Sequence, residues 1–214
     1  MTVMAKICGI STPEALRAAL DGGAGWLGFM FFEQSPRNVT PEAAARLAQP
    51  ARAGPAKVTA VLVDPSDALV DRVAQVLAPD LIQLHGAESP ARVREIGVRA
   101  GAGVVKVIPV SEAADIAAAA AYDTVVEHLM FEGKPAKDAA RPGGAGNRFD
   151  WTLLAGRRFA RPWFLAGGLD PWNVAEAVQQ SGAPLVDVSS GVERGPGLKD
   201  PALITAFLDA VRRA

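Results

Sequence analysis

The chain of 214 residues contains one cysteine, no excess of either charge and no long hydrophobic run. A single cysteine cannot form an internal disulfide, which excludes a disulfide-stapled extracellular scaffold. The 22 basic and 23 acidic residues nearly cancel, so neither nucleic-acid binding nor an acidic disordered tail is predicted. The longest apolar stretches, such as residues 113–121, fall well short of the roughly 20 residues that a membrane span needs.

The N-terminal residues lack the basic and apolar segments of a secretory signal, so we expect a reduced, cytoplasmic protein without membrane contact. In that setting Cys8 is either a core residue or a chemical one. The two histidines and Cys8 stand far apart and show none of the usual zinc spacings, so no metal site is predicted.

Short apolar runs alternate with longer, alanine-rich amphipathic segments along the whole sequence. The expected strands cover residues 3–8, 26–32, 57–63, 80–84, 104–108, 124–131, 162–166 and 185–188. Helices are expected over 12–20, from 40, from 64–66 to 77, over 89–98 and 112–120, near 150, from 170, and over 200–213. Thr12-Pro13-Glu14 and Thr40-Pro41-Glu42 are typical helix starts, with a capping threonine before proline.

Eight strand–helix units in succession predict parallel βαβ connections and a closed (β/α)₈ TIM barrel. The alternative is an open doubly wound sheet, but the turn after the first strand lacks G-x-G-x-x-G. Nothing marks a second domain, so residues 1–214 are expected to form one. The glycine-rich stretch 134–147 lies within the sixth unit and is interpreted as a functional loop. Its Gly143–Gly146 segment is either a mobile lid or a plain connection.

In such a barrel the active site lies at the C-terminal ends of the strands, and alternate residues of each strand share one face. Lys6 and Cys8 share a face of the first strand, and Lys6 is a candidate to contact the substrate. A lone cysteine is more often a small buried hydrophobe, but a neighbouring ammonium favours the reactive thiolate. We therefore predict that Cys8 is chemical rather than structural.

Other polar residues occupy the ends of later strands. Gln83 and His85 share a face of the fourth strand, and both are candidates to contact the substrate. For His85 the alternative, a cap on the next helix, remains open. Glu132 ends the sixth strand on the face of His128 and Met130, where a carboxyl is a candidate general acid. On the eighth strand Asp187 lies between two valines, so it is expected to face the barrel mouth.

Two segments of small residues are candidates for phosphate binding, because they let backbone N–H groups approach an anion. They are Gly167-Gly168 after the seventh strand and Ser189-Ser190-Gly191 after the eighth. Arg37, after the second strand, is a candidate to hold a substrate carboxylate through two parallel hydrogen bonds. The alternative for Arg37 is a solvated surface side chain.

These residues lie in motifs that resemble phosphoribosylanthranilate isomerase, in order from the first strand to the last. The motifs are Lys6-Ile7-Cys8-Gly9-Ile10, Ser35-Pro36-Arg37, Gln83-Leu84-His85-Gly86, Gly143-Gly144-Ala145-Gly146, Phe149-Asp150-Trp151, Leu165-Ala166-Gly167-Gly168-Leu169 and Val186-Asp187-Val188-Ser189-Ser190-Gly191-Val192-Glu193. The combination is highly specific and covers essentially the whole chain.

The resemblance implies a (β/α)₈ barrel that performs an Amadori rearrangement in tryptophan biosynthesis, without cofactor or metal. N-(5-phosphoribosyl)anthranilate would become 1-(2-carboxyphenylamino)-1-deoxyribulose 5-phosphate. By this resemblance Cys8 is the base, Arg37 binds the anthranilate carboxylate, and Asp187 contacts the bridging nitrogen or a ribose hydroxyl. The glycines and serines after the seventh and eighth strands hold the phosphate. The sequence leaves open whether the protein is a monomer or a homodimer.

One motif departs from the family, whose sixth strand ends in Leu-Phe-Asp-x-Lys with the aspartate as general acid. Here the segment is Met130-Phe131-Glu132-Gly133-Lys134, so the carboxylate sits one methylene further out. From the sequence we expect Glu132 to remain the acid and Glu132→Asp to raise kcat or leave it unchanged.

Two rival functions remain at this stage. Another phosphosugar barrel enzyme is disfavoured, because a histidine-pathway isomerase pairs aspartates on the first and fifth strands, where this chain has Cys8 and residues 107–109. A lyase for indole-3-glycerol phosphate usually has a longer chain and several lysines and glutamates at its strand ends. The second rival is a barrel that binds a phosphorylated ligand without turnover, and only the change at Glu132 favours it.

Overall fold

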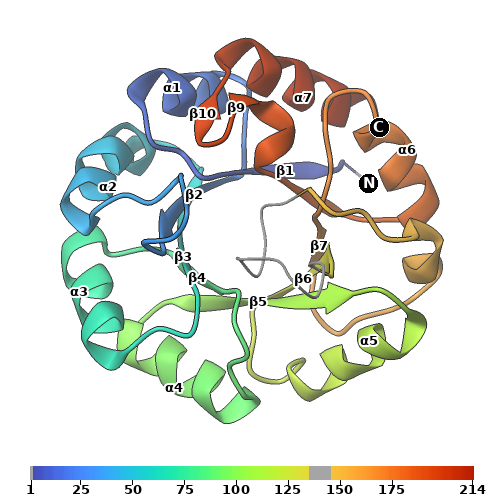
Figure 1. Ribbon diagram of the computed structural model, residues 1–214, viewed down its shortest axis with the longest axis horizontal. Helices are drawn as coiled ribbons and strands as arrows, with labels where there is room; N and C mark the ends of the chain where they lie inside the picture. Colours follow the sequence, from blue (N-terminus) through green and yellow to red (C-terminus); the bar gives the residue numbers. More distant parts are fainter. Residues whose placement is uncertain (1, 135–145) are drawn as a thin grey trace.

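A computed structural model describes residues 2–134 and 146–214 and confirms the predicted barrel. Eight parallel strands close into a ring in chain order, with β8 paired to β1, and helices surround it (Figure 1). The barrel strands are β1 (Met4–Cys8), β2 (Trp26–Phe31), β3 (Lys57–Leu62), β4 (Leu81–Leu84), β5 (Gly103–Val110), β6 (His128–Gly133), β7 (Trp163–Leu165) and β8 (Leu185–Val188).

The helices are α1 (Pro13–Asp21), α2 (Pro41–Ala48), α3 (Asp67–Leu77), α4 (Pro90–Ala100), α5 (Ala113–Ala117), α6 (Val174–Ser181) and α7 (Pro201–Arg213). Single-turn segments η1 (Gln49–Ala53), η2 (Ala118–Ala121), η3 (Trp151–Leu154) and η4 (Ser190–Val192) complete the helical structure. No helix in the described ranges is long and apolar enough to cross a membrane.

The predicted helix starts are confirmed where a side chain caps the first turn. Thr12 and Thr40 accept hydrogen bonds from backbone N–H groups three residues on, which satisfies donors that the first turn leaves free. One predicted start is wrong. Asp170 caps a turn by accepting from Trp172 N and Asn173 N, and α6 begins only at Val174.

The sixth strand is also displaced from its prediction. It was expected over 124–131, whereas β6 runs from His128 to Gly133. Residues 122–125 form a turn closed by a hydrogen bond from Val125 N to Tyr122 O, and this turn delays the strand. Glu132 therefore lies within the paired part of β6, in register with Pro109 of β5.

Two layers of apolar side chains hold the barrel. The larger layer lies between strands and helices, and the smaller fills the lumen with Trp26, Leu81, Val105, Val107, Met130, Phe164, Ala166 and Leu185. At the N-terminal ends of the strands, the rings of Trp26, His128 and Phe164 meet edge to face with centroids 5.0–5.8 Å apart. These three rings form an aromatic plug that closes the N-terminal end of the lumen, so the polar residues lie at the C-terminal end.

His128 in this plug makes the stability of the fold depend on pH. Burial lowers the pKa of His128 below its ordinary value, because the ring packs among aromatic side chains. The unfolded chain therefore binds more protons than the folded one as pH falls through the ordinary value of about 6.5. We expect the unfolding free energy to fall between pH 7.5 and 5.5 in denaturant titrations, and to fall less in His128→Gln. An equal fall of the unfolding free energy in both proteins would show that His128 is not the cause of the pH dependence.

Candidate active site

The predicted pair on the first strand is present, deep in the barrel. Lys6 is fully buried, and its Nζ lies 2.8 Å from Asp187 Oδ1 on the neighbouring strand β8. Register places Lys6 directly opposite Asp187, so the two side chains meet inside the lumen. Burial alone would lower the pKa of Lys6, but Asp187 and Cys8 raise it by more. Lys6 is therefore an ammonium held by a carboxylate, and its contact with the substrate stays a prediction.

Cys8 lies above this pair and is 4% exposed. Its pKa is raised above the ordinary thiol value, because burial outweighs the lowering effect of Lys6. The sequence predicted that Lys6 would favour the thiolate. Lys6 does act in that direction, but burial dominates in the folded chain.

Gly28 on β2 makes room for both groups. A Cβ at this position would lie 3.0 Å from Lys6 Nζ and 3.1 Å from both Cys8 Sγ and Cys8 Cα. Only a hydrogen fits there without displacing the thiol or the ammonium, which explains the glycine in a buried strand.

We expect Gly28→Ala to lower kcat/KM by about tenfold, because a displacement of a few tenths of an ångström misplaces Cys8. The loss of unfolding free energy should be about 1–3 kcal/mol, as for other overpacked sites. The matched control is Gly54→Ala, whose Cβ would meet nothing nearer than Ala51 O at 3.8 Å. Steady-state kinetics and denaturant unfolding of both variants test this, and wild-type kinetics in Gly28→Ala would contradict it.

Glu132 and His85 face one another across the mouth. His85 Nε2 lies 2.7 Å from Glu132 Oε2, without the alignment of a hydrogen bond, and both side chains are largely buried. The helix-capping interpretation of His85 is wrong, since Ser89 caps α4 by accepting from Arg92 N. A Cβ on Gly167 would lie 3.1 Å from Glu132 Cγ. The longer side chain of this chain is thus seated between the histidine and a bare glycine.

Gln83 lies deeper in the lumen on β4, two residues before His85, which follows the end of that strand. Its side chain is 1% exposed, and Oε1 has no hydrogen-bond partner among residues 2–134 and 146–214. An unpaired buried acceptor is costly and often marks a site for water or a ligand. This agrees with the predicted substrate contact of Gln83, which stays a prediction.

Arg37 is buried and is already paired within the protein. It is 5% exposed, so it is not a solvated surface residue. Its Nε and Nη2 donate to the two carboxylate oxygens of Glu193 at 2.7 and 2.8 Å. The Nε–Nη2 edge of the guanidinium is therefore occupied by Glu193, and Nη1 makes neither of these two bonds. The contact with a substrate carboxylate stays a prediction.

Glu193 and Lys199 belong to the site, although the sequence analysis gave them no role. They lie in a hairpin of β9 (Glu193–Gly195) and β10 (Leu198–Lys199), which was not predicted. Lys199 Nζ donates to Ser189 O at 2.9 Å and pairs with Glu193 Oε1. Burial raises the pKa of Glu193, but Arg37 and Lys199 together lower it by more. The signal in the sequence was Gly195-Pro196-Gly197, a strong turn that folds Lys199 back on Glu193.

The two predicted phosphate segments lie against each other. Gly167 and Gly168 have positive φ angles of 88° and 65°, a backbone conformation that residues other than glycine rarely adopt. A Cβ on Gly191 would lie 1.9 Å from Leu169 O, so this glycine allows the loop after β8 to reach the loop after β7. Ser190 begins η4 beside them. Of the Gly143–Gly146 segment, residues 143–145 lie outside the described part of the chain.

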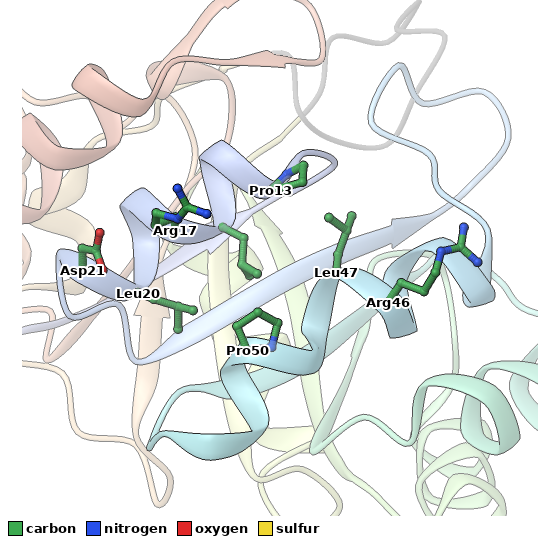
Figure 2. A pocket seen from close by; sticks show the side chains of 8 residues that line it. Pro13, Arg17, Leu20, Asp21, Arg46, Leu47 and Pro50 are labelled. Atoms are coloured by element: carbon green, nitrogen blue, oxygen red, sulfur yellow. The ribbon is translucent and has the colours of Figure 1, made fainter.

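A hollow of about 410 Å³ lies on the outside of the barrel, between α1 and α2 (Figure 2). Leu16, Leu20 and Leu47 form its apolar part, and Arg17 and Arg46 stand at its rim. It contains none of the predicted site residues. The acid, thiol and cations all gather at the C-terminal ends of the strands instead.

Comparisons with known proteins agree with this arrangement. A sequence model of the family described as N-(5'phosphoribosyl)anthranilate (PRA) isomerase matches residues 5–210. An N-(5'-phosphoribosyl)anthranilate isomerase of Caulobacter vibrioides is 65% identical over 210 residues, 98% of this chain and 96% of that protein. One of Caulobacter sp. strain K31 is 66% identical over 211 residues, 99% of each chain.

Solved structures give the same result. The phosphoribosyl anthranilate isomerase of Thermotoga maritima superimposes with a TM-score of 0.86 at 33% identity, over 99% of this chain and 100% of that one. Another phosphoribosyl anthranilate isomerase structure, with a TM-score of 0.83 at 31% identity and the same coverage, contains reduced 1-(o-carboxyphenylamino)-1-deoxyribulose 5-phosphate. With nearly the whole chain matched in sequence and in fold, this protein belongs to the N-(5'-phosphoribosyl)anthranilate isomerase family.

Proposed function

We propose that this chain is an aldose–ketose isomerase that converts N-(5-phosphoribosyl)anthranilate to 1-(2-carboxyphenylamino)-1-deoxyribulose 5-phosphate in tryptophan biosynthesis. Family membership over residues 5–210 supports the reaction. The observation in this chain that carries the proposal is the pair of candidate catalytic groups at the barrel mouth. A thiol, Cys8, ends β1, and a carboxyl, Glu132, is the last residue but one of β6, with β7 and β8 between the two strands.

The first chemical step needs an acid. In our proposal Glu132 gives its proton to the furanose ring oxygen, and the bond between C1 and that oxygen breaks with its electron pair going to oxygen. The lone pair of the bridging nitrogen forms the C1=N bond of a Schiff base. His85 lies beside this carboxyl, with Nε2 2.7 Å from Glu132 Oε2.

The second step needs a base. Cys8 as thiolate removes the proton at C2, and the C–H electron pair forms a C1=C2 bond while the C1=N pair returns to nitrogen. The resulting enolamine takes a proton at C1 and loses one from the C2 hydroxyl, giving the ketone. All atoms and electrons stay within the substrate apart from exchanged protons, so the reaction is an isomerisation.

The substrate's two anionic ends have separate partners in this proposal. Arg37, oriented by Glu193, binds the anthranilate carboxylate through Nη1. Asp187 contacts the bridging nitrogen or a ribose hydroxyl while paired with Lys6, and Gln83 adds a contact through its free Oε1. Backbone N–H groups hold the phosphate at the residues Gly167, Gly168, Ser189, Ser190 and Gly191.

Domain organisation, location, cofactor use and partners are also part of this proposal. We propose that residues 1–214 form one catalytic domain, that it works in the cytoplasm, and that it needs no cofactor or metal. Its partner is a phosphorylated small molecule rather than nucleic acid or a membrane. The Thermotoga maritima isomerase is described as dimeric and has also been solved as monomers, and for this chain either a monomer or a homodimer fits.

Turnover and binding in the same tube separate an enzyme from a binding protein. Freshly generated phosphoribosylanthranilate is added to the wild-type chain, loss of anthranilate fluorescence is followed, and thermal unfolding is measured with product present. We expect consumption with a kcat within the ordinary range of about 1–10³ s⁻¹, together with stabilisation by product. Stabilisation without consumption would identify a ligand-binding barrel and refute the enzymatic proposal.

A further inference from the structure

A buried ion pair lies behind the candidate acid and has no place in the chemistry above. Lys106 Nζ lies 2.8 Å from Glu88 Oε2, and the two side chains are 3% and 2% exposed. Lys106 is on β5 and points away from the lumen, since its neighbours Val105 and Val107 fill the lumen. Burying two charges is expensive, and apolar residues in their place are often as stable. Stability alone therefore does not account for this pair.

Lys106 and Glu88 make hydrogen bonds to the backbone on both sides of a single residue. Lys106 Nζ donates to Gly86 O at 2.7 Å and, more weakly, to Leu84 O at 3.4 Å. The Glu88 carboxylate in turn accepts from Gly86 N at 3.1 Å. The residue between Leu84 and Gly86 is His85.

Further contacts fasten the same loop. His85 N donates to Leu62 O at 2.9 Å, and Glu88 Oε1 accepts from Asp64 N at 2.9 Å. Tyr122 donates its hydroxyl to Glu88 O at 3.0 Å, and its ring lies 5.9 Å from Lys106 Nζ. Strands β3 and β5 thus both hold the turn that carries His85.

We propose that the Lys106–Glu88 pair is a positioning device for His85. His85 Nε2 lies 2.7 Å from Glu132 Oε2 across the mouth, but the two groups are not aligned for a hydrogen bond. Glu132 therefore does not fix the position of the His85 ring. The backbone of His85 must therefore be held from behind, and Lys106 and Glu88 do so. The role of Glu132 rests on the proposed function; the placement of His85 does not.

Imidazole NMR tests the placement without any assay of activity. The chain has two histidines, His85 and His128, so two sets of ring signals are expected. In Lys106→Met the His85 signals should move or broaden while those of His128 at the other end of the barrel stay. The matched control is Ile82→Val, a fully buried apolar change on β4 itself, which should leave both sets in place.

Kinetics test the consequence for catalysis. We expect Lys106→Met to lower kcat by about 10- to 100-fold, because an ångström of misplacement is costly in an active site, with KM within about twofold. In a His85→Asn background the same change should lower kcat by less than about twofold, since the residue being positioned is already absent. Ile82→Val should keep wild-type kinetics.

Glu88→Gln serves as a second variant and keeps an oxygen that accepts from Gly86 N and Asp64 N. If Lys106→Met fails to fold, the same two measurements on Glu88→Gln decide the question. Unmoved His85 signals, or losses in kcat that multiply with His85→Asn, would overturn the positioning role. An inactive wild type with His85 signals that still respond would instead refute the proposed function and leave the positioning role supported.

Discussion

Cys8→Ala is expected to lower kcat/KM by about 10³-fold, since a positioned base contributes about 10²–10⁴. The reason is local. Lys6 beside the thiol is an ammonium and cannot accept a proton, and the nearby carboxylate of Asp187 is engaged by that ammonium at 2.8 Å. Steady-state kinetics on freshly generated substrate, with circular dichroism to confirm folding, measure the effect.

Cys8→Ser is the matched control for shape. The serine hydroxyl occupies the space that the thiol fills beside Gly28, but it is far harder to deprotonate than a thiol. We therefore expect it to be nearly as inactive as Cys8→Ala while keeping product binding. A Cys8→Ser enzyme with activity near the wild type would show that the site needs only a hydrogen-bonding group at this position, and would contradict the role of base.

Glu132 gives the second large effect. Glu132→Gln is expected to lower kcat by about 10²–10⁴, because the amide keeps the size of the side chain but cannot supply the proton. Glu132→Asp is the informative variant. Shortening the side chain by one methylene, with a C–C bond of about 1.5 Å, withdraws the carboxyl from His85.

The geometry thus argues against the sequence-based expectation that Glu132→Asp is neutral or beneficial. Glu132 already contacts His85 at 2.7 Å, and a Cβ on Gly167 would lie 3.1 Å from its Cγ. We expect Glu132→Asp to lose about 10- to 100-fold in kcat, as for a misplacement of roughly an ångström. An aspartate enzyme at least as fast as the wild type would show that the site was not rebuilt around the longer residue.

The barrel could be predicted because each of its signals is local. Thr12-Pro13-Glu14 marks a helix start by itself, and eight apolar runs separated by such helices allow few other architectures. Strand parity also placed Lys6 with Cys8 and Gln83 with His85 correctly. The sixth strand was misplaced, because the β-branched residues 124–126 are typical of a strand, whereas Val125 N closes a turn on Tyr122 O.

The partners of these residues could not be predicted in the same way. The pairing of Arg37 with Glu193 joins positions 156 residues apart through an unpredicted hairpin. The balance at Cys8 depends on its depth in the barrel: a sequence shows that Lys6 is near, but not that burial outweighs it. The Lys106–Glu88 pair was missed because Lys106 lies in an apolar strand, pointing away from the lumen.

The most direct test of the acid–base account is the dependence of kcat/KM on pH in the wild type, Cys8→Ala and Glu132→Gln. Burial raises the pKa of Cys8, so we predict that kcat/KM of the wild type still rises beyond the ordinary thiol value of about 8.5. This rise should remain in Glu132→Gln and disappear from the residual activity of Cys8→Ala. A rise that persists unchanged in Cys8→Ala would assign the base to another residue and contradict the account.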